Sequence, residues 1–182
     1  MRSPETIETN RLLLRRPVLA DAEAIFWRYA SDPEVTRFLS WPRHRSVEET
    51  RAFLAFSDCE WEKWPAGPYL VEDRVERRLL GGAGLGFRSP TVAETGYVLA
   101  RDAWGFGYAT EALGAVVGVA AELGVEQLLA FRHPANTASA RVLEKCGFLR
   151  DDSPPLLISF PNAGEDQPAG CMSYVRKFGG SK

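Results

Sequence analysis

The chain has 182 residues, 45% of them hydrophobic and 25% charged, with a formal net charge of -2 at pH 7. These values predict one globular domain over residues 1–182 and argue against nucleic-acid binding, and no apolar run approaches the ~20 residues that cross a bilayer. Three widely spaced cysteines fit neither a disulfide framework nor a metal site, and the N-terminus lacks the apolar core of a secretory signal, so we expect a cytoplasmic, metal-free protein.

The first half of the chain alternates between helical and extended patterns. Residues 11–16 read as a strand ended by Pro17, and residues 20–30 carry helical periodicity. A second helix is expected from Ser46 to Trp61 or Trp64, with a capping box between Ser46 and Glu49. Three further strands are expected at residues 67–71, 78–87 and 94–100.

The second half predicts a strand–helix–strand–helix order. A long helix over residues 110–123 ends at Gly124, and Asn136 caps another helix that ends at residues 146–147. Extended segments are expected at residues 127–131, from 148 onward and at 172–178, with a long loop over 151–170. This order favours an α+β fold with a mixed, largely antiparallel central sheet flanked by helices.

The segment Trp104-Gly-Phe-Gly-Tyr-Ala-Thr-Glu111 combines a glycine turn with a helix start. Glycines allow the backbone to turn without obstruction by Cβ, and the first turn of a helix leaves its N–H groups without intrahelical partners. Such N–H groups at the positive end of a helix dipole favour a phosphate or a pyrophosphate. The alternative is a tight turn without a ligand.

Three segments of the sequence resemble the GNAT superfamily of acyl-CoA-dependent N-acetyltransferases, and most closely its ribosomal-protein N-terminal acetyltransferase branch. They are residues 12–17 with Asp21, residues 94–99 followed by 104–112, and Asn136-Thr-Ala-Ser-Ala-Arg-Val-Leu-Glu-Lys-Cys-Gly-Phe148. Trp104 stands where the superfamily commonly has Gln or Arg, so it supplies no cation. The tail after Arg150 matches the branch poorly.

The resemblance implies acetyl-CoA as the acetyl donor and a set of residues that bind it. The diphosphate is expected on the amides of the glycine turn, and the pantetheine arm on a strand backbone and on the start of the later helix. The residues are Gly105, Phe106, Gly107, Tyr108, Ala109 and Thr110 for the diphosphate, and Tyr97, Val98, Leu99, Asn136, Ser139 and Arg141 for the rest.

Two residues carry the expected chemistry. Glu94 is the candidate base for the amine, and Ser139 is the candidate donor of a proton to the departing thiolate. Each has an ordinary structural alternative: an exposed carboxylate at a strand end for Glu94, and a small residue in a first helical turn for Ser139. Asn136 is equally well explained as an N-cap, and Arg141 as a solvated cation.

The acceptor is expected to be an amine, either a protein N-terminus or a small molecule. Trp27 and Trp41 are the candidate acceptor-binding residues, because the resembling family builds this pocket from its first helices and aromatic rings attract cations. Core packing is the alternative for these tryptophans. The sequence carries no signal for oligomeric state.

Two other functions compete with acetyl transfer. A non-catalytic acyl-CoA sensor would keep the same cofactor residues. A nicotinamide-binding enzyme is disfavoured, because Thr110 replaces the third glycine or alanine of the dinucleotide turn and residues 101–104 separate the strand from the glycines.

Overall fold

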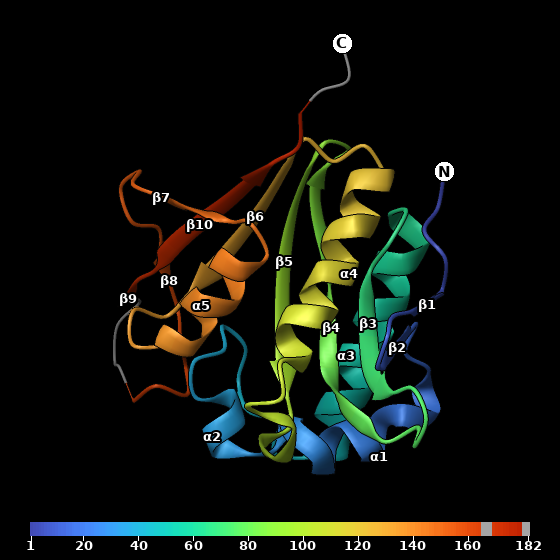
Figure 1. Ribbon diagram of the computed structural model, residues 1–182. Helices are drawn as coiled ribbons and strands as arrows, with labels where there is room; N and C mark the ends of the chain where they lie inside the picture. The colour runs from blue at the N-terminus through green and yellow to red at the C-terminus, as the bar shows by residue number, and fades with distance from the viewer. Residues whose placement is uncertain (165–168, 180–182) are drawn as a thin grey trace.

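A computed structural model describes residues 1–164 and 169–179 of the chain (Figure 1). Within these residues one eight-stranded sheet runs in the order β1-β2-β3-β4-β5-β6-β10-β7. Every neighbouring pair is antiparallel except β5 and β6, which are parallel. The mixed, largely antiparallel sheet flanked by helices agrees with the predicted α+β architecture.

The first half of the chain supplies one edge of the sheet and the helices that cover one of its faces. The expected helix over residues 20–30 is divided into a 3₁₀ turn, an α turn and a π turn. Asp32 then caps α2 by accepting hydrogen bonds from the N–H groups of Glu34 and Val35. The elements are β1 (Thr6–Glu8), β2 (Leu12–Arg15), η1 (Leu19–Asp21), α1 (Ala22–Ile25), η2 (Phe26–Ala30), α2 (Pro33–Thr36) and α3 (Val47–Lys63).

The second half follows the predicted order closely. Its elements are β3 (Pro68–Asp73), β4 (Leu79–Ser89), β5 (Val92–Leu99), η3 (Arg101–Ala103), α4 (Tyr108–Glu122), β6 (Gln127–Arg132), α5 (Thr137–Lys145), β7 (Leu149–Asp151) and β10 (Met172–Lys177). The expected long loop at 151–170 is wrong in part: β8 (Leu157–Ile158) and β9 (Ala169–Gly170) pair as a short antiparallel ribbon. Residues 165–168 of that predicted loop lie outside the described part of the chain.

The expected capping box of α3 is also corrected. Ser46 is the N-cap residue, but its side chain makes no capping hydrogen bond. The carboxylate of Glu49 instead accepts a hydrogen bond of 2.8 Å from the backbone N–H of Arg45. One stripe of α3 is buried against the sheet, and it consists of Thr50, Leu54, Ser57 and Trp61.

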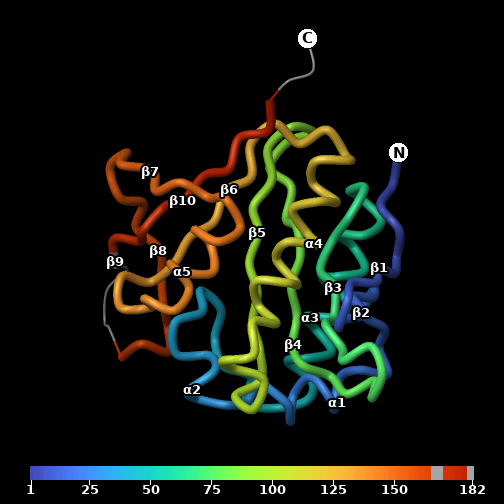
Figure 2. Tube along the Cα trace, viewed as in Figure 1, coloured from blue at the N-terminus to red at the C-terminus, as the bar shows by residue number. Residues whose placement is uncertain are grey.

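Figures 1 and 2 show the two helical layers. Helices α4 and α5 cover the near face of the sheet, whereas α1 and α3 lie behind it. Helix α4 packs through Leu113, Val116 and Ala120, which are fully buried in the main core. The segment between α2 and α3 turns toward the start of α5, where Phe38 stacks on His133 with ring centroids 4.8 Å apart. This segment brings residues of the first third of the chain beside the cofactor-side helices.

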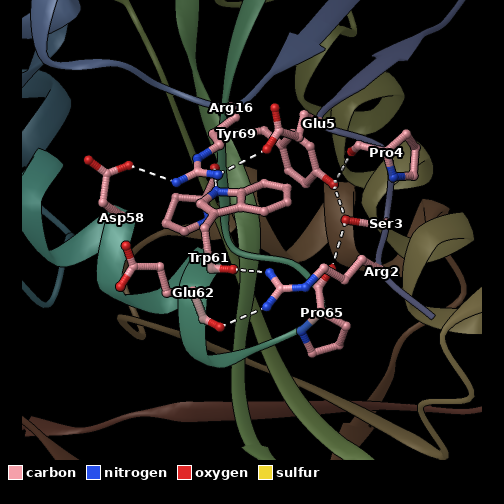
Figure 3. A network of polar contacts seen from close by, with 11 residues as sticks. Arg2, Ser3, Pro4, Glu5, Arg16, Asp58, Trp61, Glu62, Pro65 and Tyr69 are labelled. Atoms are coloured by element: carbon pink, nitrogen blue, oxygen red, sulfur yellow. Dashed lines mark hydrogen bonds and ion pairs between the residues drawn. The ribbon is translucent and has the colours of Figure 1, made fainter.

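The N-terminal residues anchor the C-terminal end of α3 (Figure 3). The guanidinium of Arg2 donates to the carbonyl oxygens of Trp61 and Glu62, which lie in the last turn of the helix. Ser3 donates from its backbone N–H to the carbonyl oxygen of Pro65 at 2.8 Å, and its hydroxyl lies 2.8 Å from that of Tyr69. Carbonyl groups that the helix leaves unpaired are thereby satisfied, which holds α3 against β3.

None of the helices in the described residues is long and apolar enough to cross a membrane. The same residues contain no cluster of three or more His, Cys, Asp or Glu side chains placed to hold a metal ion.

Candidate active site

The parallel strands β5 and β6 separate along their length. They pair only at Val92 with Gln127, Ala93 with Leu128 and Glu94 with Leu129. Beyond Glu94 strand β5 continues to Leu99, paired on its β4 side only. The two strands therefore form a wedge that opens toward the end of β5, where the chain enters η3 and α4.

The wedge exposes main-chain groups of β5. The N–H of Ala100 donates to the carbonyl oxygen of Leu80, and bonds to one neighbour in an antiparallel ladder come from alternate residues. Val98 therefore directs its backbone groups at β4, whereas Tyr97 and Leu99 direct theirs into the wedge. The indole Nε1 of Trp104 already donates to the Leu99 carbonyl at 2.8 Å, so Trp104 fixes the loop against this strand.

A cluster of amides lies where the glycine turn enters α4. Gly105 and Gly107 have φ values of +83° and +80°, a backbone region that favours glycine. Gly107 is the N-cap residue of α4 and offers no side-chain cap. Within the described residues no acceptor pairs with the N–H groups from Gly105 to Thr110. Unpaired amides at the positive end of a 15-residue helix are suited to bind an anionic group.

Residues of the first strands hold this turn from behind. Arg11 donates from Nε to the carboxylate of Glu111 at 2.7 Å and from Nη1 to the Phe106 carbonyl at 2.9 Å. Thr9 donates to the same carboxylate at 2.7 Å. Partial burial opposes ionisation of Glu111, but the hydrogen bonds from Thr9 and Arg11 hold the pKa of its carboxyl below the usual value. We call Thr9, Arg11 and Glu111 the loop clasp.

Asn136, Ser139 and Tyr97 meet beside the wedge. The Asn136 side chain accepts a hydrogen bond from the N–H of Ser139, so its expected N-cap role is confirmed. The hydroxyl groups of Ser139 and Tyr97 lie 2.9 Å apart. Burial raises the pKa of Tyr97 to about 12, although the Ser139 hydrogen bond opposes the shift. The phenol is therefore protonated at neutral pH and can donate.

A cavity of about 740 Å³ joins this point to the other face of the sheet. Tyr97, Asn136 and Ser139 line one end of it. The other walls come from β4, α3 and the segment between α2 and α3, including Trp41, His44, Phe53 and Phe56. The sheet is open at the wedge, so groups bound on its two faces can meet there.

Glu94 also lines this cavity, and it forms an ion pair with Arg88. His44 packs against Trp41 with ring centroids 5.2 Å apart and the ring planes tilted by 48°, and its Nδ1 lies 2.8 Å from the Thr50 hydroxyl. Burial lowers the pKa of His44 although the nearby Glu49 carboxylate opposes this. The imidazole therefore adds no positive charge to the cavity at neutral pH.

The other sequence-predicted residues are dispersed. Trp41 lines the cavity, whereas Trp27 is 73% exposed and lies outside it. Arg141 lies exposed on α5, also outside the cavity. The thiol of Cys146 is buried, which raises its pKa and keeps it protonated. His133 is buried, and its Nδ1 accepts a hydrogen bond of 3.1 Å from the N–H of Ala135.

Comparison with known proteins identifies the family. The acetyltransferase (GNAT) domain family matches residues 11–149. The chain is a member of the GNAT acetyltransferase family. An uncharacterized N-acetyltransferase, p20, from Bacillus licheniformis is 30% identical over 155 residues, which span 81% of this chain and 86% of that protein. The family resemblance read from the sequence is confirmed.

Solved structures confirm the GNAT fold. A GNAT-family acetyltransferase from Bacillus anthracis superposes with a TM-score of 0.80 at 25% identity, covering 94% of this chain and 98% of that one. RimL, the ribosomal L7/L12 α-N-protein acetyltransferase, in complex with coenzyme A gives a TM-score of 0.82 at 20% identity, with coverage of 95% and 98%. Family membership supports acetyl-CoA as the donor in a transfer of acetyl groups.

Sequence reasoning missed several residues of this GNAT site. The phenol of Tyr97 and the loop clasp depend on contacts between distant segments, which no local pattern reveals. Glu60, Phe53 and Phe56 of α3 were missed although they carry a signal. Together with Glu49 they recur at intervals of four, three and four residues. This spacing places them in one stripe along α3, next to the stripe that is buried against the sheet.

Proposed function

We propose that this protein transfers the acetyl group of acetyl-CoA directly to a primary amine in a ternary complex. The observation that carries the proposal is the wedge at Tyr97, which opens toward the end of β5 and the unpaired amides of residues 105–110 and borders the cavity behind the sheet. A donor bound on one face and an amine bound on the other are brought together there, which supplies proximity. Residues 1–182 act as one domain in this proposal, because β1 and β10 join the same sheet.

The donor is held by main-chain groups in this proposal. The amides of Gly105, Phe106, Gly107, Tyr108, Ala109 and Thr110 bind the diphosphate, and the backbone of Tyr97 with the N–H of Leu99 pairs with the pantetheine arm, as an added strand would. Val98 contributes its side chain to the cavity wall, because its backbone faces β4. Asn136 offers its side-chain amide from the start of α5, and Arg141 attracts the phosphates from solvent.

The thioester supplies an activated carbonyl carbon, and the residues at the wedge manage the protons. The amine nitrogen forms a bond to that carbon, the carbon–sulfur bond breaks, and the departing thiolate takes a proton from Tyr97 or Ser139. Their hydroxyl groups share a hydrogen bond, so one can reprotonate the other. Glu94 accepts the proton that the amine loses, directly or through water.

Tyr97→Phe tests the proton donor. We expect kcat to fall about 10- to 100-fold, at the low end of general-acid effects because a thiolate is a moderate leaving group. The KM for acetyl-CoA should not change, because the proposed binding of acetyl-CoA uses main-chain groups and not the phenol of Tyr97. Steady-state thiol release measures both constants, with Tyr174→Phe as the control, because Tyr174 does not line the cavity and its hydroxyl contacts the guanidinium of Arg132. A kcat equal in both variants would remove Tyr97 from the reaction.

Glu94→Gln tests the base. Turnover at pH 7 should fall by up to about 100-fold, more than acetyl-CoA affinity falls, because the charged amine must lose a proton before attack. The deficit should shrink as pH rises above the pKa of the amine, which is about 7.7–8.0 for an α-amino group and about 10.4 for a lysine side chain. The measurement is kcat against pH, and an identical profile in variant and wild type excludes this role.

A panel of amines tests the function as a whole. Calorimetry with acetyl-CoA establishes donor binding, and thiol release with each amine establishes transfer. Saturation at about 100 times the dissociation constant should stabilise the fold by roughly 2.7 kcal/mol. Donor binding without turnover on any amine would favour an acyl-CoA sensor, and absence of donor binding would remove both functions.

A further inference from the structure

Glycines form much of the floor of the cavity behind the wedge, with the side chains of Glu94 and Val98 beside them. Gly82, Gly84 and Gly86 alternate along β4, so they lie on one face of the sheet, and Gly96 of β5 is paired with Gly84. All four line the cavity. A Cβ built on Gly86 or Gly96 meets nothing within 4 Å. Gly84 is required by the close approach of the Pro68 backbone, which would lie 2.6 Å from a Cβ at that position. Gly86 and Gly96 have no such packing reason, and glycine weakens strands, so these two positions are better explained by space for a ligand.

Helix α3 contributes one stripe of side chains to the same cavity. Glu49, Phe53, Phe56 and Glu60 line the cavity, with carboxylates at the two ends and phenyl rings between them. Phe56 is 56% exposed. Two aromatic rings opposite a smooth floor form a slot suited to a flat apolar group.

The floor offers few hydrogen bonds to a ligand. Strand β4 is paired with β5 from Gly81 to Ser89 and with β3 as far as Gly84, so most of its N–H and C=O groups are used within the sheet. A peptide or a polyhydroxylated amine lying on this floor would leave polar groups unpaired, which costs free energy. The floor therefore favours an apolar body.

The charges of the slot favour a single cation. Glu94 is paired with Arg88, and Glu49 accepts a hydrogen bond from the backbone of Arg45. In the described part of the chain, Glu60 has no ion pair and no side-chain hydrogen bond. Arg132, the cation that lines the cavity, donates to the carbonyl oxygens of His133 and Pro134. Glu49 keeps its negative charge, because a backbone N–H does not neutralise it, but its hydrogen bond and its neighbour His44 hold it in place. Glu60 is thus the carboxylate of the slot that can turn to one ammonium group without losing a partner.

We propose that the acceptor is a small primary amine with one positive charge on a flat apolar body, of the arylalkylamine class. The inference rests on the proposed acetyl transfer and names the substrate of that same site. The aromatic body lies between the glycine floor and the rings of Phe53 and Phe56, and Glu60 attracts the ammonium group. The neutral amine then attacks at the wedge.

The first experiment compares acceptors with saturating acetyl-CoA. Thiol release is measured with phenethylamine, tryptamine, ethanolamine, spermidine and a peptide amide that begins with serine. We expect kcat/KM for the two arylalkylamines to exceed the values for the other three acceptors by about 10- to 100-fold. This ratio corresponds to the free energy gained when one aromatic side chain is buried. A preference for the peptide assigns the slot to protein N-termini and overturns the inference, as does a preference for spermidine.

The second experiment fills the slot. Gly86→Val should raise the KM for phenethylamine at least about tenfold, since the ring loses its burial, while acetyl-CoA affinity holds. Stability should not fall, because valine favours strands and its Cβ meets open space. Gly118→Ala on the exposed side of α4 is the control. An unchanged KM in Gly86→Val overturns the slot.

The third experiment removes the free charge. Glu60→Gln should raise the KM for phenethylamine about tenfold, and the neighbouring exposed Glu62→Gln should not. Calorimetric binding of phenethylamine to the protein with coenzyme A needs no turnover, so it separates the two proposals. Binding that Gly86→Val abolishes supports the slot even if no acetyl transfer occurs, and absence of binding to the wild type overturns it.

Discussion

Gly107→Val is expected to weaken acetyl-CoA binding about 10- to 100-fold for each phosphate hydrogen bond that is lost. Gly107 has a φ of +80°, which a β-branched residue rarely adopts, and it lies at the centre of the unpaired amides. A valine there either strains the turn or rotates the amides away from the phosphates. Its Cβ would also lie 3.6 Å from Nη2 of Arg11, in the loop clasp.

The strain has to be separated from the loss of the site. Gly124 ends the same helix with a φ of +77° and open space around its Cβ position, so Gly124→Val is a matched control. Both variants should lose about 1–3 kcal/mol of stability from backbone strain. Calorimetry should find the affinity reduced in Gly107→Val alone. Equal affinities would place the diphosphate away from this turn.

Local signals in the sequence predicted the elements that surround the site. Asn136 caps α5 as expected, and the glycines at 124 and 147, expected as helix ends, both adopt a φ of +77°. The prediction of a regular helix from local periodicity failed where the backbone hydrogen bonds are not of the α-helical type. Ser31 donates from its N–H to the carbonyl oxygen of Phe26, five residues earlier, so the expected helix over 20–30 ends in a π turn.

Contacts between distant segments limited the prediction of the site. The glycine turn is local and could be read directly, but Tyr97 meets Ser139 across 42 positions and Arg11 meets Glu111 across 100. Such pairs follow from sheet order, which one sequence does not specify. The alternating glycines at 82, 84 and 86 were visible as a pattern. They indicate a binding slot only when the structure shows that they line the same cavity as the aromatic residues of α3.

Arg15→Met is expected to destabilise the fold by about 3–5 kcal/mol, because it leaves the buried Asp21 carboxylate without its guanidinium and leaves Glu72 with Arg77 alone. Arg15 donates to both oxygens of Asp21, at 2.8 and 2.6 Å, and to Glu72 at 2.6 Å. The side chains of Asp21 and Glu72 are 13% and 7% exposed. The thermal midpoint should fall by about 6–20 °C for a domain of this size.

The adjacent arginine provides the control. Arg16 pairs with Glu5 and Asp58, whose side chains are 66% and 51% exposed (Figure 3). Arg16→Met should therefore cost about 0–1 kcal/mol, the usual value of an exposed ion pair. Equal losses in the two variants would mean that burial of the Arg15 network contributes nothing beyond a surface contact.

The pH dependence of the same pair identifies the charge as the cause. Burial opposes ionisation of Asp21, yet hydrogen bonds from Arg15 and from the Val18 N–H hold the pKa of its carboxyl below the ordinary value. A depressed folded-state pKa adds stability that is present above the unfolded value of about 3.9 and lost as pH falls through the folded value.

In Arg15→Met the guanidinium no longer opposes the effect of burial on Asp21. As pH falls, the Asp21 carboxyl is therefore protonated in the variant before it is protonated in the wild type, and this protonation removes the unpaired buried charge. Chemical denaturation should thus show the gap between wild type and Arg15→Met largest near pH 7 and narrowing below pH ~4. A gap that is constant with pH would assign the loss to packing of the arginine stem.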